Sequence, residues 1–192
     1  MITAKYVPSR TAQELANSLT KMVNTYARRG FVIDLALTDM EFEKVREKLE
    51  IVEVNTTAAR EHVPDIEHQI RLIKEHFTCT TSDFPFNPIP RLVIIHIVYT
   101  CVVWLNAIPR KSDAVQGISP REIVTGRTVN YKRDCRACMG GYAEASTDVI
   151  VMNDNTPHTH SCITLGPSGN RQGSVKCFAL ETGRIVVCRT IN

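Results

Sequence analysis

The sequence lacks any segment that could cross a membrane. Its most apolar run, Leu92–Leu105, is interrupted by His96 and is shorter than the roughly 20 apolar residues that a transmembrane helix needs. The N-terminal residues also lack the apolar core of a signal peptide. We therefore expect an intracellular protein without a membrane partner.

A disulfide framework and a strong charge of one sign are also missing. The seven cysteines are an odd number and are scattered along a chain without a secretory signal, which favours reduced thiols. The formal net charge is only +3 over 192 residues. This charge permits a nucleic-acid partner without requiring one.

The first part of the chain alternates helical and strand patterns. A helix is expected after Pro8, with Ser9 or Thr11 as its cap, and Glu14 completes a capping box if Thr11 is the cap. The strands Phe31–Leu37 and Ile51–Val54 follow, with a short helix between them. This alternation predicts an α/β layer whose strands are at least partly parallel.

Three further helices are predicted. The first opens at Pro64 and carries an apolar stripe that we expect to be buried; the stripe consists of Ile66, Ile70, Ile73 and Phe77. The second, Arg91 to about Asn106, is apolar nearly all round and should also be buried. Ser119 caps the third, a short helix ending near Gly126.

From Gly140 onward the helical periodicity disappears, and short strand patterns separated by turns take over. We expect four strands, at Val149–Met152, Cys162–Leu165, Val175–Leu180 and Arg184–Cys188. Such spacing predicts a small antiparallel barrel or sheet. A domain boundary should lie between about residues 127 and 140.

Two acidic residues stand where a protein can gather carboxylates around a divalent metal ion. Asp39 follows the strand Phe31–Leu37, and Glu67 lies in the first turn of the helix that opens at Pro64. Arg71 and Lys74 follow Glu67 along one edge of that helix. They are either phosphate contacts or part of a solvated helix face. Each carboxylate also has a simpler explanation, since acids cap helices and favour first turns.

Several short motifs occur in an order and spacing that resemble the integrase region of copia-type retrotransposons. They are Thr38–Phe42, Glu61–Pro64, Trp104–Asn106, Ser119–Glu122 and Leu165–Asn170. The resemblance implies a partial RNase H-like integrase core, lacking its first strands, over residues 1–127. It further implies a linker at 128–139 and a small antiparallel SH3-like β domain over 140–192.

By this resemblance the reaction is metal-dependent DNA 3′-end processing and strand transfer. Asp39 and Glu67 match the second and third of three catalytic carboxylates that hold Mg²⁺ or Mn²⁺. Arg71 and Lys74 become DNA contacts, homo-oligomers are possible partners, and a functional protein acts in the nucleus. The family's first carboxylate lies on an earlier strand, so we expect this chain to lack one ligand and not to catalyse alone. The strand Phe31–Leu37 should then present an open apolar edge.

Two alternatives remain from the residues. One is a non-catalytic nucleic-acid-binding or assembly module that depends on Arg71, Lys74 and the β domain. The other is a zinc site, because Cys135 and Cys138 form a CxxC pair and His158 and His160 follow later. We favour ordinary loop thiols for the cysteines, because a lone CxxC pair is a weak signal.

Overall fold

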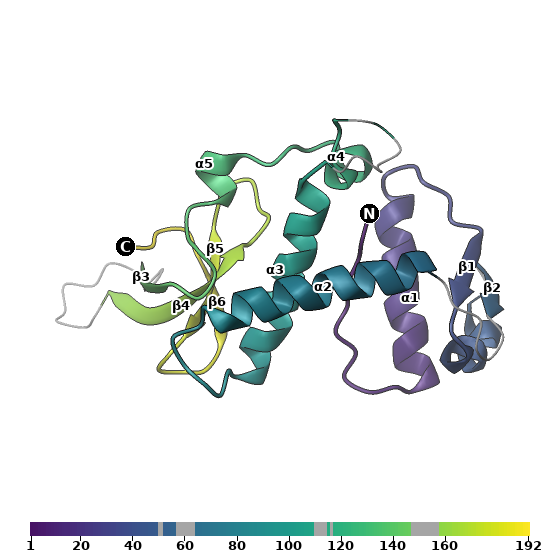
Figure 1. The fold of residues 1–192 in the computed structure, drawn as a ribbon, viewed down its shortest axis with the longest axis horizontal. Helices are drawn as coiled ribbons and strands as arrows, with labels where there is room; N and C mark the ends of the chain where they lie inside the picture. Colours follow the sequence, from purple (N-terminus) through teal and green to yellow (C-terminus); the bar gives the residue numbers. More distant parts are fainter. Residues whose placement is uncertain (50–51, 57–63, 110–114, 116, 147–157) are drawn as a thin grey trace. The chain divides into compact units, whose positions relative to one another are not determined.

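A computed structural model of residues 1–192 describes the whole chain except 50–51, 57–63, 110–114, 116 and 147–157 (Figure 1). The chain contains both helices and β-sheets. The predicted mixed α and β fold class is confirmed at this level. It forms two compact units: unit 1 holds residues 1–72 and 108–127, and unit 2 holds 73–107 and 128–192. None of the helices in the described ranges is long and apolar enough to span a bilayer.

Unit 1 begins with helix α1 (Ala12–Ala27), which is capped by Thr11, one of the two residues that the sequence offered for this role. The Thr11 side chain accepts a hydrogen bond from the backbone N–H of Glu14 at 3.4 Å. The buried face of α1, with Leu15 and Ala16, packs against Val45 in the 3₁₀ helix η1 (Met40–Lys48). Burial of these apolar side chains, with Phe42 beside them, forms the core of this unit.

Two strands of unit 1 pair in parallel, which confirms that prediction. Strand β1 (Leu35–Thr38) lies beside β2 (Glu53–Thr56), and Leu35 is opposite Glu53. β1 starts later than predicted, because Phe31 instead donates its N–H to the Tyr26 carbonyl at the end of α1. The side chains alternate between two faces, so Val54 is buried while Leu35 and Leu37 are 47% and 52% exposed.

Helix α2 (Pro64–Ser82) begins at Pro64 as predicted, but its apolar stripe is not buried. Ile66 and Ile70 are 47% and 46% exposed, and no residue of α2 is fully buried. Only Phe77 packs, partly buried, against a core cluster of unit 2. Helical periodicity places apolar residues on one face, but burial also requires a second element to cover that face.

The short helix α4 (Pro120–Thr125) has the ends that the sequence predicted. The Ser119 hydroxyl accepts a hydrogen bond from the N–H of Glu122 at 3.2 Å. Gly126 ends the helix with a positive φ of 66°, a conformation that glycine adopts without a steric penalty.

Unit 2 contains an antiparallel four-stranded sheet in the order β3-β4-β5-β6. The strands are β3 (Tyr142–Ser146), β4 (Thr159–Pro167), β5 (Val175–Ala179) and β6 (Ile185–Cys188). The last three match predicted strands, β3 was not predicted, and the expected strand at 149–152 lies outside the described residues. Unit 2 resumes at Thr128, where the sequence predicted a linker to begin; the predicted domain limits stay a prediction.

Residues 190–192 pair with part of the outer edge of the sheet in unit 2. Glu144 and Asn192 exchange two backbone hydrogen bonds, and Ser146 donates to the carbonyl of Thr190. Residues 190–192, which follow β6, therefore pair with the free edge of β3. The antiparallel sheet, one of the two forms that the sequence predicted, is thus covered along part of this edge.

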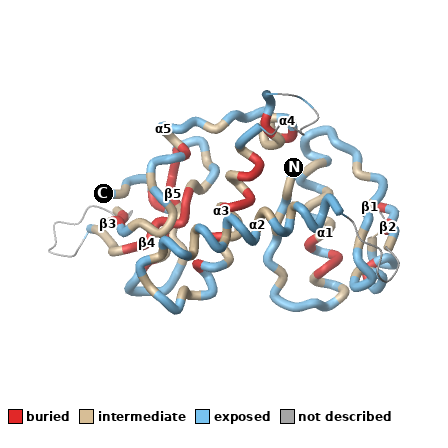
Figure 2. The backbone as a smooth tube through the Cα atoms, in the orientation of Figure 1, coloured by how far each residue is buried: buried red, intermediate tan, exposed pale blue. Residues whose placement is uncertain are grey.

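Two apolar clusters stabilise unit 2, and Figure 2 shows their buried residues on the strands and on α3 (Arg91–Ala107). One cluster lies among the strands and includes Cys162, Cys177 and Cys188. The other joins Val93, Ile97 and Cys101 of α3 to Leu165 of β4. The predicted burial of α3 is thus correct for one face, while Leu92 is 45% exposed.

Candidate functional site

Asp39 lies directly after β1, at the strand end where the sequence placed it. Its side chain caps η1 by accepting a hydrogen bond from the N–H of Met40 at 2.7 Å. The residue is exposed to solvent. The capping role expected for Asp39 is therefore present, and the carboxylate remains accessible for a second role as a metal ligand.

A further carboxylate lies near this strand end. Thr38 and Thr56, the last residues of β1 and β2, are opposite each other. The Thr56 hydroxyl donates to the Glu43 carboxylate at 2.7 Å, and Arg46 donates to the same group at 3.3 Å. These two donors hold the pKa of Glu43 below its ordinary value, Thr56 more than Arg46. The sequence analysis missed Glu43, because only the strand register brings it to this edge.

Glu67 lies in the first turn of α2 and is exposed. It shares this turn with Asp65, and both acids are favoured there by the helix dipole. Asp39 and Glu67 belong to the same unit. Residues 57–63, which connect β2 to α2, lie outside the described part of the chain.

The described side chains do not by themselves make a site that fits Mg²⁺. Within the described ranges, no three His, Cys, Asp or Glu side chains come together as metal ligands. Mg²⁺ prefers six oxygen ligands in a near-octahedral arrangement, several of which can be water. Within the described ranges, Asp39 and Glu67 therefore belong to no carboxylate triad of the kind that a two-metal centre uses.

Arg71 and Lys74 are both exposed on α2. One terminal nitrogen of the Arg71 guanidinium lies 3.0 Å from Nδ1 of His68. Because a guanidinium only donates, Nδ1 of His68 accepts this hydrogen bond. Exposed cations at helical spacing can contact phosphates or simply face solvent.

The CxxC residues and the later histidines do not form a metal site among the described residues. Cys135 and Cys138 are exposed free thiols in the turn after α5 (Tyr131–Asp134). His160 lies on β4, where its Nδ1 is 3.4 Å from the Glu181 carboxylate.

A polar cluster on β3 and β4 was also absent from the sequence analysis. Ser161 donates a hydrogen bond to the Glu144 carboxylate at 3.1 Å, and the Tyr142 hydroxyl donates to the same oxygen. These bonds, from Tyr142 first and Ser161 second, hold the pKa of Glu144 below its ordinary value. Alternation along β3 puts Tyr142 and Glu144 on one face, but the sequence carries no signal for their pairing with Ser161.

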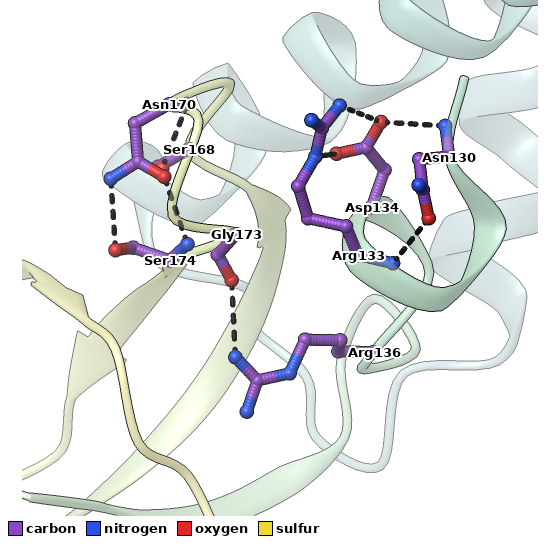
Figure 3. A network of polar contacts seen from close by, with 8 residues as sticks. All are labelled: Asn130, Arg133, Asp134, Arg136, Ser168, Asn170, Gly173 and Ser174. Carbon is purple, nitrogen blue, oxygen red and sulfur yellow. Dashed lines mark hydrogen bonds and ion pairs between the residues drawn. The ribbon is translucent and has the colours of Figure 1, made fainter.

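A second polar network holds the β4–β5 loop (Figure 3). The Asn170 side chain bonds both the N–H and the hydroxyl of Ser174, at 2.9 and 2.8 Å. Nearby, the Arg136 guanidinium donates to the carbonyl of Gly173 at 3.2 Å. Arg133 pairs with the buried carboxylate of Asp134 at 2.8 Å. The network fixes the loop against the segment that follows α5.

Comparisons with known proteins do not add to this geometry. No family model matches the chain, and no curated protein matches it either. A functional assignment therefore depends on the sequence motifs and on the arrangement of the described residues.

Proposed function

We propose that the chain is an integrase-like module of the copia retrotransposon type, with a partial RNase H-like core and an SH3-like β domain. One observation carries the proposal: two parallel strands place Asp39 directly after β1, and the helix that follows β2 carries Glu67 in its first turn. Carboxylates at a strand end and in a nearby helix are suited to gathering Mg²⁺ or Mn²⁺. On this proposal the partner is DNA and the place of action is the nucleus.

The proposal does not assign catalysis to this chain alone. Glu14 and Asp34 are the acidic residues that precede Asp39. The N–H of Glu14 is bonded to Thr11 in the first turn of α1, and the carbonyl of Asp34 accepts a hydrogen bond from Glu53. Neither carboxylate joins Asp39 in a group of three ligands within the described residues.

Metal binding tests the site independently of activity. We expect Asp39→Asn and Glu67→Gln each to weaken Mn²⁺ binding to the purified chain, measured by electron paramagnetic resonance of free Mn²⁺. Asp65→Asn is a matched control, because Asp65 shares the first turn of α2 with Glu67. Equal Mn²⁺ affinity in all four proteins, wild type included, would contradict the assignment of the two ligands.

A strand-transfer assay tests the expectation that this chain does not catalyse alone. With labelled duplex oligonucleotides and either Mg²⁺ or Mn²⁺, we expect only background transfer by the purified chain. Robust transfer that disappears on Asp39→Ala would show that the chain is a complete enzyme.

A second candidate function is a non-catalytic DNA-binding or assembly module. The exposure of Arg71 and Lys74 one turn apart on α2 favours it. If these residues contact phosphates, Arg71→Ala should weaken DNA binding and lower the slope of log affinity against log salt by about 1. Asp39→Ala should leave this binding unchanged. Light scattering of the purified chain would test whether the module forms homo-oligomers.

A further inference from the structure

The two cysteines of the CxxC motif differ from most thiols of unit 2 in their exposure. Cys135 and Cys138 are both exposed, and Cys79 is exposed on α2. The other thiols among the described residues of this unit are buried: Cys101, Cys162, Cys177 and Cys188. Burial raises the pKa of the Cys177 thiol, and a thiol that stays protonated is a poor nucleophile. The CxxC motif is therefore where solvent reaches two thiols that are close in the sequence.

Hydrogen bonds fix the backbone at both of these cysteines. The N–H of Cys135 donates to the carbonyl of Tyr131 at 3.0 Å, at the end of α5. The carbonyl of Cys138 accepts hydrogen bonds from the hydroxyl of Thr164 on β4 and from the N–H of Gly141. Because each cysteine is already held in place, a bond between them would cost little additional conformational entropy.

The chain bends between the two cysteines. Arg136 and Ala137 are both bend positions, and a four-residue turn brings its first and last Cα atoms within about 7 Å. This separation falls within the range that a disulfide can bridge. The Arg136 guanidinium donates to the carbonyls of Gly173 and Arg189, at 3.2 and 2.9 Å, and Figure 3 shows its side chain reaching Gly173. These contacts hold the bend in place.

A metal ion fits this pair less well than a covalent bond does. Within the described ranges, no three His, Cys, Asp or Glu side chains come together as metal ligands. A structural zinc site needs four such ligands. Two exposed thiols at this spacing suit the formation of a disulfide between them.

Positive charge surrounds the motif. Lys132 and Arg133 precede Cys135, and Arg136 follows it. Arg133 is paired with the buried carboxylate of Asp134, whereas Lys132 and Arg136 are exposed. The carbonyls that bind Arg136 are neutral and leave its charge in place. Such surroundings attract small anionic molecules.

We propose that Cys135 and Cys138 are a redox-active dithiol, which an anionic low-molecular-weight disulfide such as glutathione disulfide oxidises to an intramolecular disulfide. One cysteine thiolate attacks a sulfur of the small disulfide and expels one small thiolate. The second cysteine thiolate then attacks the mixed disulfide and expels the other small thiolate. The two cysteines give up two electrons and two protons, and the small disulfide leaves as two thiols. This proposal does not depend on the integrase-like function.

Mass spectrometry of the folded, reduced chain after exposure to glutathione disulfide tests the proposal. We expect peptide mapping of the wild type to show a disulfide between Cys135 and Cys138, and excess reduced glutathione to restore both thiols. Cys135→Ser and Cys138→Ser should each keep one glutathione on the remaining cysteine of the motif, because no second thiol expels it. Cys79→Ala is the matched control: it removes another exposed thiol of unit 2 and should leave the disulfide unchanged.

Reaction rates test the preference for an anionic disulfide. Relative to free cysteine, the motif should react about threefold faster with glutathione disulfide than with neutral hydroxyethyl disulfide at low salt. The preference should disappear at about 1 M salt, which screens exposed charges. Stable glutathione adducts on both cysteines of the wild type, a motif that stays reduced while Cys79 is modified, or equal relative rates at low salt would overturn the proposal.

Discussion

Gly173 is a single residue on which the arrangement of the β4–β5 loop depends. Its φ is +74°, and a Cβ atom placed there would lie 2.5 Å from Cγ of Arg133. Its carbonyl also accepts the hydrogen bond from Arg136. The absence of a side chain thus lets the loop approach the segment that carries Arg133 and Arg136.

We expect Gly173→Ala to lower the free energy of unfolding by about 3 kcal/mol, because it adds a steric clash to an unfavourable φ. Gly169→Ala provides the matched control. Gly169 has a φ of +82° with no atom within 4 Å of the added Cβ, so this change should cost only about 1 kcal/mol. Urea denaturation of both variants measures the difference, and equal losses would show that the Arg133 side chain simply moves aside.

At the scale of elements, α3 combines apolar packing with one titratable group. His96 lies half-buried on α3, with its ring 5.7 Å from the ring of Tyr99. Burial lowers the pKa of His96 below 6.5, and the charge of Lys176 on β5 lowers it further. The neutral imidazole is therefore the form that suits the folded unit.

This shift makes stability depend on pH. The unfolded chain binds a proton at His96 near pH 6.5, before the folded chain does, so the free energy of unfolding should fall as pH drops from about 7 toward 5. His96→Gln should flatten the curve in this range, and Lys176→Met should reduce its slope. Urea denaturation at intervals between pH 8 and 5 measures the effect. A slope that persists in His96→Gln would assign it to another group.

Local patterns along the chain predicted the element ends well. The caps at Thr11 and Ser119 and the stop at Gly126 were correct, because each depends on atoms within four residues along the chain. Burial of Ile66 and Ile70 was predicted wrongly, because it depends on which element covers α2. The strand β3 was missed, because its short sequence becomes a strand only by pairing with β4 and with residues 190–192.

The same difference between local patterns and long-range contacts holds for the candidate site. The sequence located Asp39 at a strand end and Glu67 in a first helical turn, since both positions follow from local patterns. It did not find Glu43, which is joined to Thr56 across elements, or Arg136, which is held by carbonyls far along the chain.

At the scale of the whole molecule, each of the two units has a core of its own. Val45 is fully buried in unit 1 with Leu15 and Ala16, and Leu165 is 1% exposed in unit 2 with Val93 and Ile97. Because these clusters contain no common residue, we expect the units to open as separate cooperative regions.

Hydrogen exchange with paired core variants tests this expectation. Val45→Ala should cost about 2 kcal/mol and accelerate amide exchange in α1 roughly 30-fold, with little change in β5. Leu165→Ala should do the reverse. If either substitution accelerates exchange equally in α1 and β5, the chain unfolds as one cooperative body.

The pairing of residues 190–192 with β3 has a consequence for how unit 2 is made. During translation, β3 leaves the ribosome well before the segment that pairs with its outer edge. Until then the strand presents unpaired backbone groups, which are a template for pairing with other chains. A stop codon before Thr190 would leave this edge of β3 permanently uncovered.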